Sequence, residues 1–399
     1  MDLTKIIRDY QNKNKNKKTS IFVDLADNII SNFSYKLKEK TYLLIPDPKE
    51  ELIEIKYEYK LLKGKDMPNS LFLNILNIMN KFHETVQSLG FTIITSISQY
   101  QNDGLLFDLL GTEFDDLNLA ESDLIADFSN INIPITLSVD EYLNNMFLPA
   151  VFKNITANRG EDKYLIENNE QLNRILSLLN IPESEKLKLK EEFVVQEYIK
   201  GFDGINSSMR VLATCTGDIV SSLLLASIND KPNKNVKQYG IDVLNPSEYL
   251  NDPKSPYFIN SKNIVSNAAA GGKIIPLNKE IKDIHFDEHV LLTLHEINSK
   301  SLEIPEQIIT MTKHIANAWG SKKGILLGID FIYNSDNDTW YYLETNKNPA
   351  VEGYKRFMNL EGYLKKDIKA LMQLDGIIKI VTNINEKKLD NNNLQNKKS

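Results

Sequence analysis

GILLGIDFIYNSDNDTWYYLETN, which spans residues 324–346, contains two apolar runs of strand length on either side of a short polar segment. The polar segment, NSDND at residues 334–338, consists of residue types that favour turns. Two strand-like runs joined by such a turn predict a β-hairpin. We expect this hairpin to carry the chemistry of the protein.

Three polar side chains define the hairpin. If the turn closes it, residues whose numbers sum to about 674 face each other, so Asp330 lies opposite Glu344. Like charges at facing positions destabilise a sheet, and a divalent cation is the simplest compensation. Asn346 lies on the same face as Glu344, because side chains alternate along a strand. Three oxygen ligands with further positions open suit Mg²⁺, although the hairpin alone is equally consistent with solvent-facing acids.

Composition limits the class of protein. The chain has 399 residues, of which 42% are hydrophobic and 25% charged, enough for two or three domains. Its one cysteine, Cys215, excludes an internal disulfide and favours a reducing cytoplasm. No apolar run has the length of a signal peptide or a membrane span. A net charge of −7 argues against a broad nucleic-acid surface.

Apolar spacing along the rest of the chain predicts alternating strands and helices. Two segments rich in Asn and Lys, residues 11–18 and 386–399, bury little and are predicted to lie outside the fold. The expected strands are 41–46, 91–98, 148–153, 163–166, 192–199, 209–214 and 218–226, and the expected helices are 70–89, 169–179 and one from Pro305.

Four motifs occur in a fixed order: LPAVFKNITANRGEDKYLIEN, FVVQEYIKGFD, SNAAAGGKIIPL and the hairpin with its following Asn-x-x-Pro. Together they resemble the ATP-grasp superfamily, and most of all its RimK-like and glutathione-synthetase-like carboxylate-amine ligases. The resemblance covers roughly residues 120–374.

In the first motif the resemblance implies that Lys153 contacts the α and β phosphates of ATP. Gly160 would belong to a mobile lid at residues 158–162, where the missing side chain lets the backbone approach the phosphates. Lys163 would share this role or be merely exposed. A lysine that ends an apolar strand is also often a surface residue with a buried stem.

In the second motif the resemblance assigns the adenine pocket to Gln196 and the backbone of Glu197, Tyr198 and Ile199. Asp203 would bind the ribose hydroxyls. The residues alone also allow an ordinary core strand followed by a turn.

In the third motif Asn267, Gly271 and Gly272 would pass close to the phosphates and the acyl intermediate. Relatives often carry a basic residue where this chain has Ala270, which leaves Arg210 as the expected cation at the reacting centre. In the fourth, Asp330, Glu344 and Asn346 match the family's metal ligands.

Another departure lies upstream, where Glu121 stands at the position of a nucleotide-contacting lysine in many relatives. No arrangement of Ser, His or Cys predicts a nucleophilic centre. The histidines, His83, His285, His289, His295 and His314, lie outside the motifs.

The resemblance implies an α/β architecture in which two α+β subdomains grip ATP behind an α/β N-terminal domain. The expected divisions are a variable segment at 1–40, the N-terminal domain at 41–135, the lid subdomain at 136–204, the large subdomain at 205–380 and a disordered tail at 381–399.

The expected activity is an ATP- and Mg²⁺-dependent ligation of a carboxylate to an amine through an acyl phosphate. Mn²⁺ is an alternative metal, and a homodimer, a cytoplasmic location and small-molecule or peptide substrates are expected, without nucleic acid or membrane partners. Two alternatives stay open: an ATP-grasp kinase of the inositol-phosphate type, and an inactive nucleotide-binding regulator.

Overall fold

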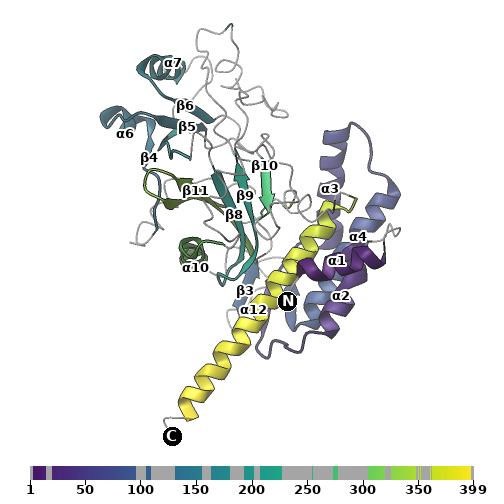
Figure 1. Ribbon diagram of the computed structural model, residues 1–399. Coiled ribbons are helices and arrows are strands. Elements are labelled where there is room, and N and C mark those ends of the chain that lie inside the picture. The colour runs from purple at the N-terminus through teal and green to yellow at the C-terminus, as the bar shows by residue number, and fades with distance from the viewer. Residues whose placement is uncertain are drawn as a thin grey trace.

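The computed structural model shows three separate β-sheets with helices packed around them (Figure 1). Within the described residues, no helix is both long enough and apolar enough to cross a bilayer. The structure describes residues 3–14, 20–95, 105–108, 131–154, 163–179, 193–201, 207–226, 254, 273–276, 304–319, 325–346, 349, 351, 360 and 362–396.

The first sheet is parallel and has the strand order β2-β1-β3. Parallel neighbours need a long crossover, and helices α3 and α4 supply it between β1 and β2. The α/β alternation expected for this region is therefore present. The elements are β1 (Thr41–Leu44), α3 (Pro48–Lys63), α4 (Asn69–Ser88), β2 (Phe91–Ile94) and β3 (Leu105–Asp108).

The second sheet is antiparallel, with the order β4-β7-β5-β6. One of its faces is apolar and packs with residues of α6 and α7 around Phe152, Tyr164 and Val195. Asn168 caps α7 by accepting a hydrogen bond from the backbone of Gln171 at 3.0 Å. The elements are β4 (Thr136–Ser138), α6 (Val139–Asn144), β5 (Ala150–Asn154), β6 (Lys163–Ile166), α7 (Asn169–Leu179) and β7 (Phe193–Glu197).

The third sheet is antiparallel, with the order β10-β9-β8-β11-β12. Helix α10 covers one face, where Met311 and Ile315 pack with Ile329 and Phe331 in a buried cluster. The predicted helix after Pro305 and the predicted hairpin of β11 and β12 are both confirmed. The elements are β8 (Ser207–Thr214), β9 (Ile219–Ala226), β10 (Lys273–Pro276), α10 (Glu306–Trp319), β11 (Leu326–Asn334) and β12 (Thr339–Asn346).

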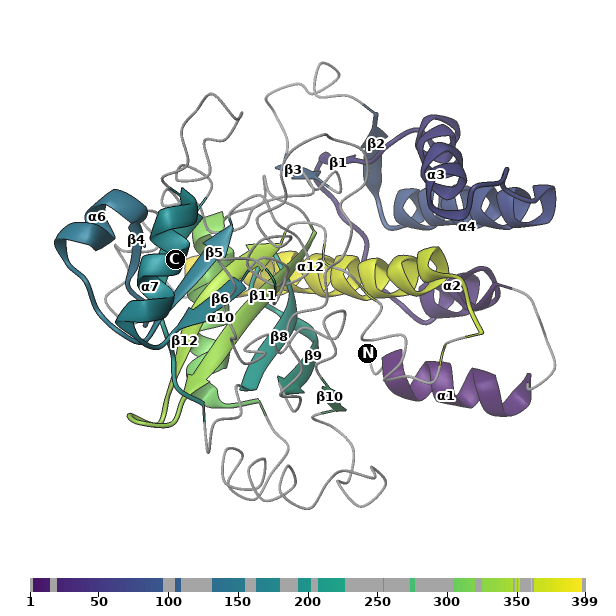
Figure 2. The same ribbon diagram turned by 90° about the horizontal axis from the view of Figure 1, so that it is seen from above.

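The long helix α12 (Lys365–Asn396) joins the third sheet to a group of N-terminal helices that includes α1 (Leu3–Lys13) and α2 (Ile21–Ser31). Its approach to β11 is close, because a Cβ on Gly376 would lie 2.7 Å from the side chain of Leu326. Figures 1 and 2 place the N-terminal helices at one end of the molecule and the second sheet at the other.

Asp367 fastens α12 to α2. Its carboxylate accepts hydrogen bonds from the Ser20 hydroxyl at 2.6 Å and from the backbone of Phe22 at 2.8 Å. These groups lie at the N-terminus of α2, where unsatisfied N–H groups favour an anion. Residues 20–22 are thus held against the C-terminal helix, and Phe22 is part of the same core.

Two expectations from the sequence were wrong in this part of the fold. Residues 11–13 belong to α1 and were not expected in the fold. The tail at 381–399 is not disordered throughout, because α12 continues to Asn396 and Val381 is fully buried. Once a helix is nucleated, each further residue adds a hydrogen bond at little cost, so a polar extension without a breaker remains helical.

Truncation of α12 tests where the body of the protein ends. Removing residues 386–399 should leave the melting temperature unchanged, because Glu386 and Lys387 are exposed. Removing residues 377–399 should unfold the protein, because it also takes away four buried apolar residues. Each contributes about 1.5–3 kcal/mol, a sum comparable with a typical stability of about 5–15 kcal/mol. Thermal denaturation measures both, and equal melting temperatures would contradict this packing.

Candidate functional site

The site lies on the face of the third sheet that points away from α10. Asp330 on β11 and Glu344 on β12 are direct cross-strand partners, as predicted. The turn, however, has four residues, and the strand register shifts by one residue between Asp330 and Phe331. This β-bulge places both carboxylates on the same face.

Arg210 on β8 neutralises Asp330. Its guanidinium donates two hydrogen bonds to the carboxylate, one from Nε to Oδ1 at 2.7 Å and one from the terminal nitrogen to Oδ2. The two residues face each other across β8 and β11. A bidentate pair of this kind fixes the orientation of both groups.

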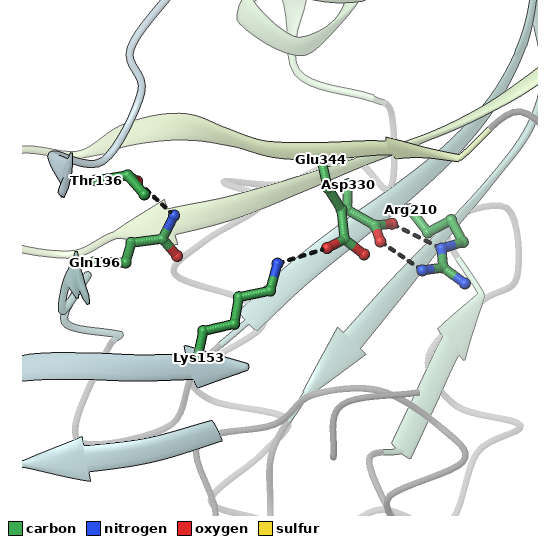
Figure 3. A network of polar contacts seen from close by, with 6 residues as sticks. All are labelled: Thr136, Lys153, Gln196, Arg210, Asp330 and Glu344. Atoms are coloured by element: carbon green, nitrogen blue, oxygen red, sulfur yellow. Dashed lines mark hydrogen bonds and ion pairs between the residues drawn. The ribbon is translucent and has the colours of Figure 1, made fainter. Parts of the chain in front are cut away.

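Lys153 reaches the same site from the second sheet. Its ammonium donates to Oε2 of Glu344 at 3.2 Å, and the side chains are only 7% and 16% exposed. Figure 3 shows Lys153 and Arg210 approaching the two carboxylates from opposite sides. The site therefore spans both sheets, and each sheet contributes one cation.

Electrostatics in this cluster are balanced, because two anions and two cations cancel formally. Burial raises the pKa of the Asp330 carboxyl, the guanidinium of Arg210 lowers it, and the negative charge of Glu344 raises it again. A buried charge is tolerated only when it is paired. Arg210 and Lys153 thus offset the negative charge of this hairpin face.

Gly328 and Pro349 shape the floor beside the carboxylates. Gly328 faces Asn346, so both lie in the same cross-strand position, two residues from the acidic pair. A Cβ on Gly328 would lie 2.7 Å from the Cβ of Pro349. Pro349 therefore lies against β11, and only glycine at position 328 leaves room for it.

The second sheet presents a mixed surface toward the site. Lys153 and Lys163 face each other across β5 and β6, and like charges at such positions favour an anion between them. The pairings put Val151, Val194 and Leu165 on this same face, because Phe152, Tyr164 and Val195 fill the opposite one. The result is a basic end beside an apolar patch.

Gln196 lies at the far end of this patch, and Thr136 was not anticipated beside it. The Gln196 amide donates to the Thr136 hydroxyl at 3.0 Å across β7 and β4 (Figure 3). The only sequence signal for Thr136 would have been its alternation with the core residue Leu137, too short to fix a register.

The segment expected to bind adenine lies between the two sheets. The backbone N–H of Glu197 donates to the carbonyl of Ile135 at 2.7 Å, so this donor is already used. Ile199 is buried and Tyr198 is half-buried. The Lys200 carbonyl accepts from the backbone of Ser335 at 3.0 Å, which ties the segment to the turn of the hairpin.

Several predicted site residues belong to segments that the structure does not describe. Gly160, Asp203, Asn267, Gly271 and Gly272, together with Ala270 and Glu121, lie outside the described residues. Cys215 is buried, and burial raises its pKa to about 12, so its thiol is not ionised near neutral pH. This agrees with the absence of a predicted nucleophilic cysteine.

The donor set is compatible with magnesium. Two carboxylates and the Asn346 side chain on one face supply oxygen ligands, which this hard cation prefers. Each carboxylate has about four lone-pair positions, so an oxygen that accepts from Arg210 or Lys153 still has acceptor capacity. Within the described ranges no group of three or more His, Cys, Asp or Glu residues could hold a metal. Phosphate oxygens or water would have to complete the shell.

No protein-family model and no curated protein matches the chain in sequence. Among solved structures it is similar to ATP-grasp ligases. For the ATP-grasp ligase PsnB with a minimal precursor, identity is 12%, coverage is 82% of this chain and 76% of PsnB, and the TM-score is 0.33. For D-alanine–D-alanine ligase from Bacillus anthracis with ATP, identity is 12%, coverage is 67% of this chain and 65% of the ligase, and the TM-score is 0.32. For the VanG D-Ala:D-Ser ligase from Enterococcus faecalis, identity is 14%, coverage is 65% of this chain and 60% of the ligase, and the TM-score is 0.33.

The match thus spans less than two thirds of the length of the two D-alanine ligases. TM-scores near 0.3 do not establish a common activity. The function of this chain therefore has to be inferred from the geometry of its own site.

Gly328→Ala tests the close packing beside the carboxylates. The new methyl group should displace Pro349 and with it Asn346, which would lower the melting temperature and weaken metal-dependent ATP binding. Gly362→Ala is the matched control, because a Cβ there has no atom within 4 Å. Thermal denaturation and calorimetric titration measure both variants. Identical behaviour of the two would show that the segment after β12 is not held against β11.

Proposed function

We propose that the chain is an ATP-grasp enzyme, a ligase that uses ATP and Mg²⁺ to join a carboxylate to an amine. The observation that carries the proposal is the pair of facing carboxylates, Asp330 and Glu344. Asp330 pairs with a cation of the third sheet, Arg210, and Glu344 pairs with a cation of the second sheet, Lys153. This arrangement brings metal-binding and phosphate-binding groups together where two sheets meet. The order of the sequence motifs supports it independently.

The nucleotide would lie between the sheets. The apolar patch of Val151, Val194 and Leu165 suits the adenine ring, with Gln196 at its end. Lys153 and Lys163 would bind the phosphates, since two adjacent ammonium groups favour a polyanion. Tyr198 and Ile199 are proposed for the adenine edge, and Asp203 for the ribose.

Binding of Mg²⁺ and ATP would exchange partners within the cluster. The phosphates offer Lys153 and Arg210 new anionic partners, while Asp330, Glu344 and Asn346 hold the metal. Bound there, the metal supplies charge neutralisation for the phosphates. In both states each buried charge has an opposite charge beside it, so neither state leaves a buried charge unpaired.

The proposed reaction has two steps. A substrate carboxylate oxygen attacks the γ-phosphorus, the bond to the β-phosphate oxygen breaks, and ADP leaves. The substrate amine then attacks the acyl carbon, phosphate leaves, and the nitrogen loses a proton as the amide forms. Lys153 and Arg210 contribute by positioning and by neutralising charge, which is most of what phosphoryl transfer requires.

Metal-dependent turnover tests the function. With Mg²⁺, a carboxylate and an amine, the protein should release ADP and phosphate and form a condensed product detectable by mass spectrometry. Asp330→Asn and Glu344→Gln should abolish turnover, and circular dichroism should show that both remain folded. Phosphate transferred to a hydroxyl would favour a kinase instead, and full activity in the double variant would contradict the metal assignment.

Lys153→Ala tests the phosphate contact. Loss of a charge-assisted hydrogen bond costs about 1.5–3 kcal/mol, which is roughly a 10- to 150-fold weaker ATP affinity. Lys200→Ala is the matched control, because Lys200 is exposed and its ammonium pairs with the exposed Asp336 in the turn of the hairpin. Calorimetry with ATP and Mg²⁺ measures both. Unchanged affinity in Lys153→Ala would move the phosphate contact to Lys163.

A further inference from the structure

The β-bulge in β12 decides on which face Glu344 lies. From Asn334 opposite Thr339 to Phe331 opposite Tyr342, the hairpin follows one register. Continued without interruption, that register would put Leu343 opposite Asp330 and Glu344 opposite Ile329. The observed partner of Asp330 is Glu344, so Leu343 is the extra residue of the bulge.

An uninterrupted strand would place Glu344 in the core. Ile329 is fully buried in the cluster under α10, together with Phe331 and Tyr342. A carboxylate at that position would be surrounded by apolar groups, which is unfavourable without a partner. With the bulge, Thr345 takes the position opposite Ile329 and is fully buried instead.

A hydrogen bond between two hydroxyl groups spans the bulge on the core side. The hydroxyls of Tyr342 and Thr345 lie 2.7 Å apart, and both residues are fully buried. Tyr342 is the last core-facing residue before the extra residue, and Thr345 is the first one after it. The bond therefore joins the two ends of the irregular segment that contains Leu343 and Glu344.

Packing holds one end of this bond in place. The ring of Tyr342 contacts that of Phe331 edge-on, with centroids 6.3 Å apart. The position of the Tyr342 hydroxyl is thus set by the core, and Thr345 must come to it. Buried hydroxyl groups need a partner. Loss of the bulge would turn Thr345 to the opposite face from Tyr342, break this hydrogen bond and bury the Glu344 carboxylate.

We propose that Tyr342 and Thr345 are positioning residues for the metal ligand Glu344. Their hydroxyl pair fixes the bulge from the core side and so keeps the Glu344 carboxylate opposite Asp330. This inference rests on the proposed function, since it assigns the pair a role in metal-dependent ATP binding. Both side chains face the core, on the side of the hairpin opposite to the Glu344 carboxylate.

Four variants separate this role from general stability. Tyr342→Phe and Thr345→Val each remove one hydroxyl while nearly keeping volume, and Thr345→Ser retains the hydroxyl. Tyr333→Phe is the matched control, because it removes the hydroxyl of another core tyrosine, which bonds Asp338 at the other end of the same hairpin. The readouts are melting temperature and ATP affinity by calorimetry, the latter in EDTA and over a series of Mg²⁺ concentrations.

Mutation of an outer-shell group that orients a metal ligand costs about 10- to 100-fold in metal affinity. Tyr342→Phe and Thr345→Val should therefore raise the half-saturating Mg²⁺ concentration about tenfold or more, with ATP affinity in EDTA unchanged. Thr345→Ser and Tyr333→Phe should stay within about twofold of the natural protein on this same scale. The proposal would be overturned if all four variants had the same half-saturating Mg²⁺ concentration, or if Tyr333→Phe raised it as much as Tyr342→Phe and Thr345→Val do.

Glu344→Gln separates failure of the positioning role from failure of the metal site. If it loses Mg²⁺ dependence while Tyr342→Phe and Thr345→Val do not, the metal site stands and the positioning role fails. If the natural protein shows no Mg²⁺ dependence, the proposed function fails. A crystal structure of Thr345→Val then decides on positioning alone: Glu344 displaced from Asp330 supports it, and Glu344 still opposite Asp330 overturns it.

Discussion

Repulsion between two carboxylates at facing positions of one hairpin is the constraint on which the rest of this structure depends. Asp330 is buried and Glu344 is largely shielded, so two negative charges at these facing positions require cations beside them. The protein meets this requirement with Arg210 from the neighbouring strand and Lys153 from another sheet. The bond between Lys153 and Glu344 joins the second sheet to the third, so the same ion pair that neutralises Glu344 also holds the two sheets together.

The remaining fold supports this cluster from both faces of the third sheet. Helix α10 packs on the opposite face of the third sheet and gives the core in which Tyr342 and Thr345 are fixed. Helix α12 packs on the same face as the charged cluster, against Leu212 and Leu326, and joins the sheet to the N-terminal helices. The charged face is therefore built on strands whose backs are held by apolar packing, which suits a site that must exchange ionic partners without unfolding.

Much of this could be predicted from the sequence, because strong periodicity and short motifs act locally. The hairpin, the helix after Pro305 and the strand that carries Lys153 follow from apolar spacing. The facing of Asp330 and Glu344 was predicted correctly, yet with a longer turn and no bulge. Nothing in the sequence around Leu343 indicates a bulge, since its energy comes from core contacts made only after folding. Pairing between distant segments was less predictable still. Lys153 was expected at the phosphates and Arg210 at the reacting centre. The bond of Arg210 to Asp330 depends on the pairing of β8 with β11, and the bond of Lys153 to Glu344 depends on how two sheets meet.

Two further features could not be predicted for related reasons. The helical continuation to Asn396 was missed, because composition reports how little a segment buries and says little about extension of an existing helix. Thr136 was missed because its role exists only through the register of β4 and β7.

The most direct test of the metal site is a calorimetric titration of the natural protein with ATP, in EDTA and in saturating Mg²⁺. If the facing carboxylates hold a metal that binds the phosphates, Mg²⁺ should strengthen ATP binding by about 1–3 kcal/mol, the usual size of coupling between two ligands. An ATP affinity that is the same with and without Mg²⁺ would contradict the metal site, and would show that Asp330 and Glu344 form a purely structural ion-pair cluster.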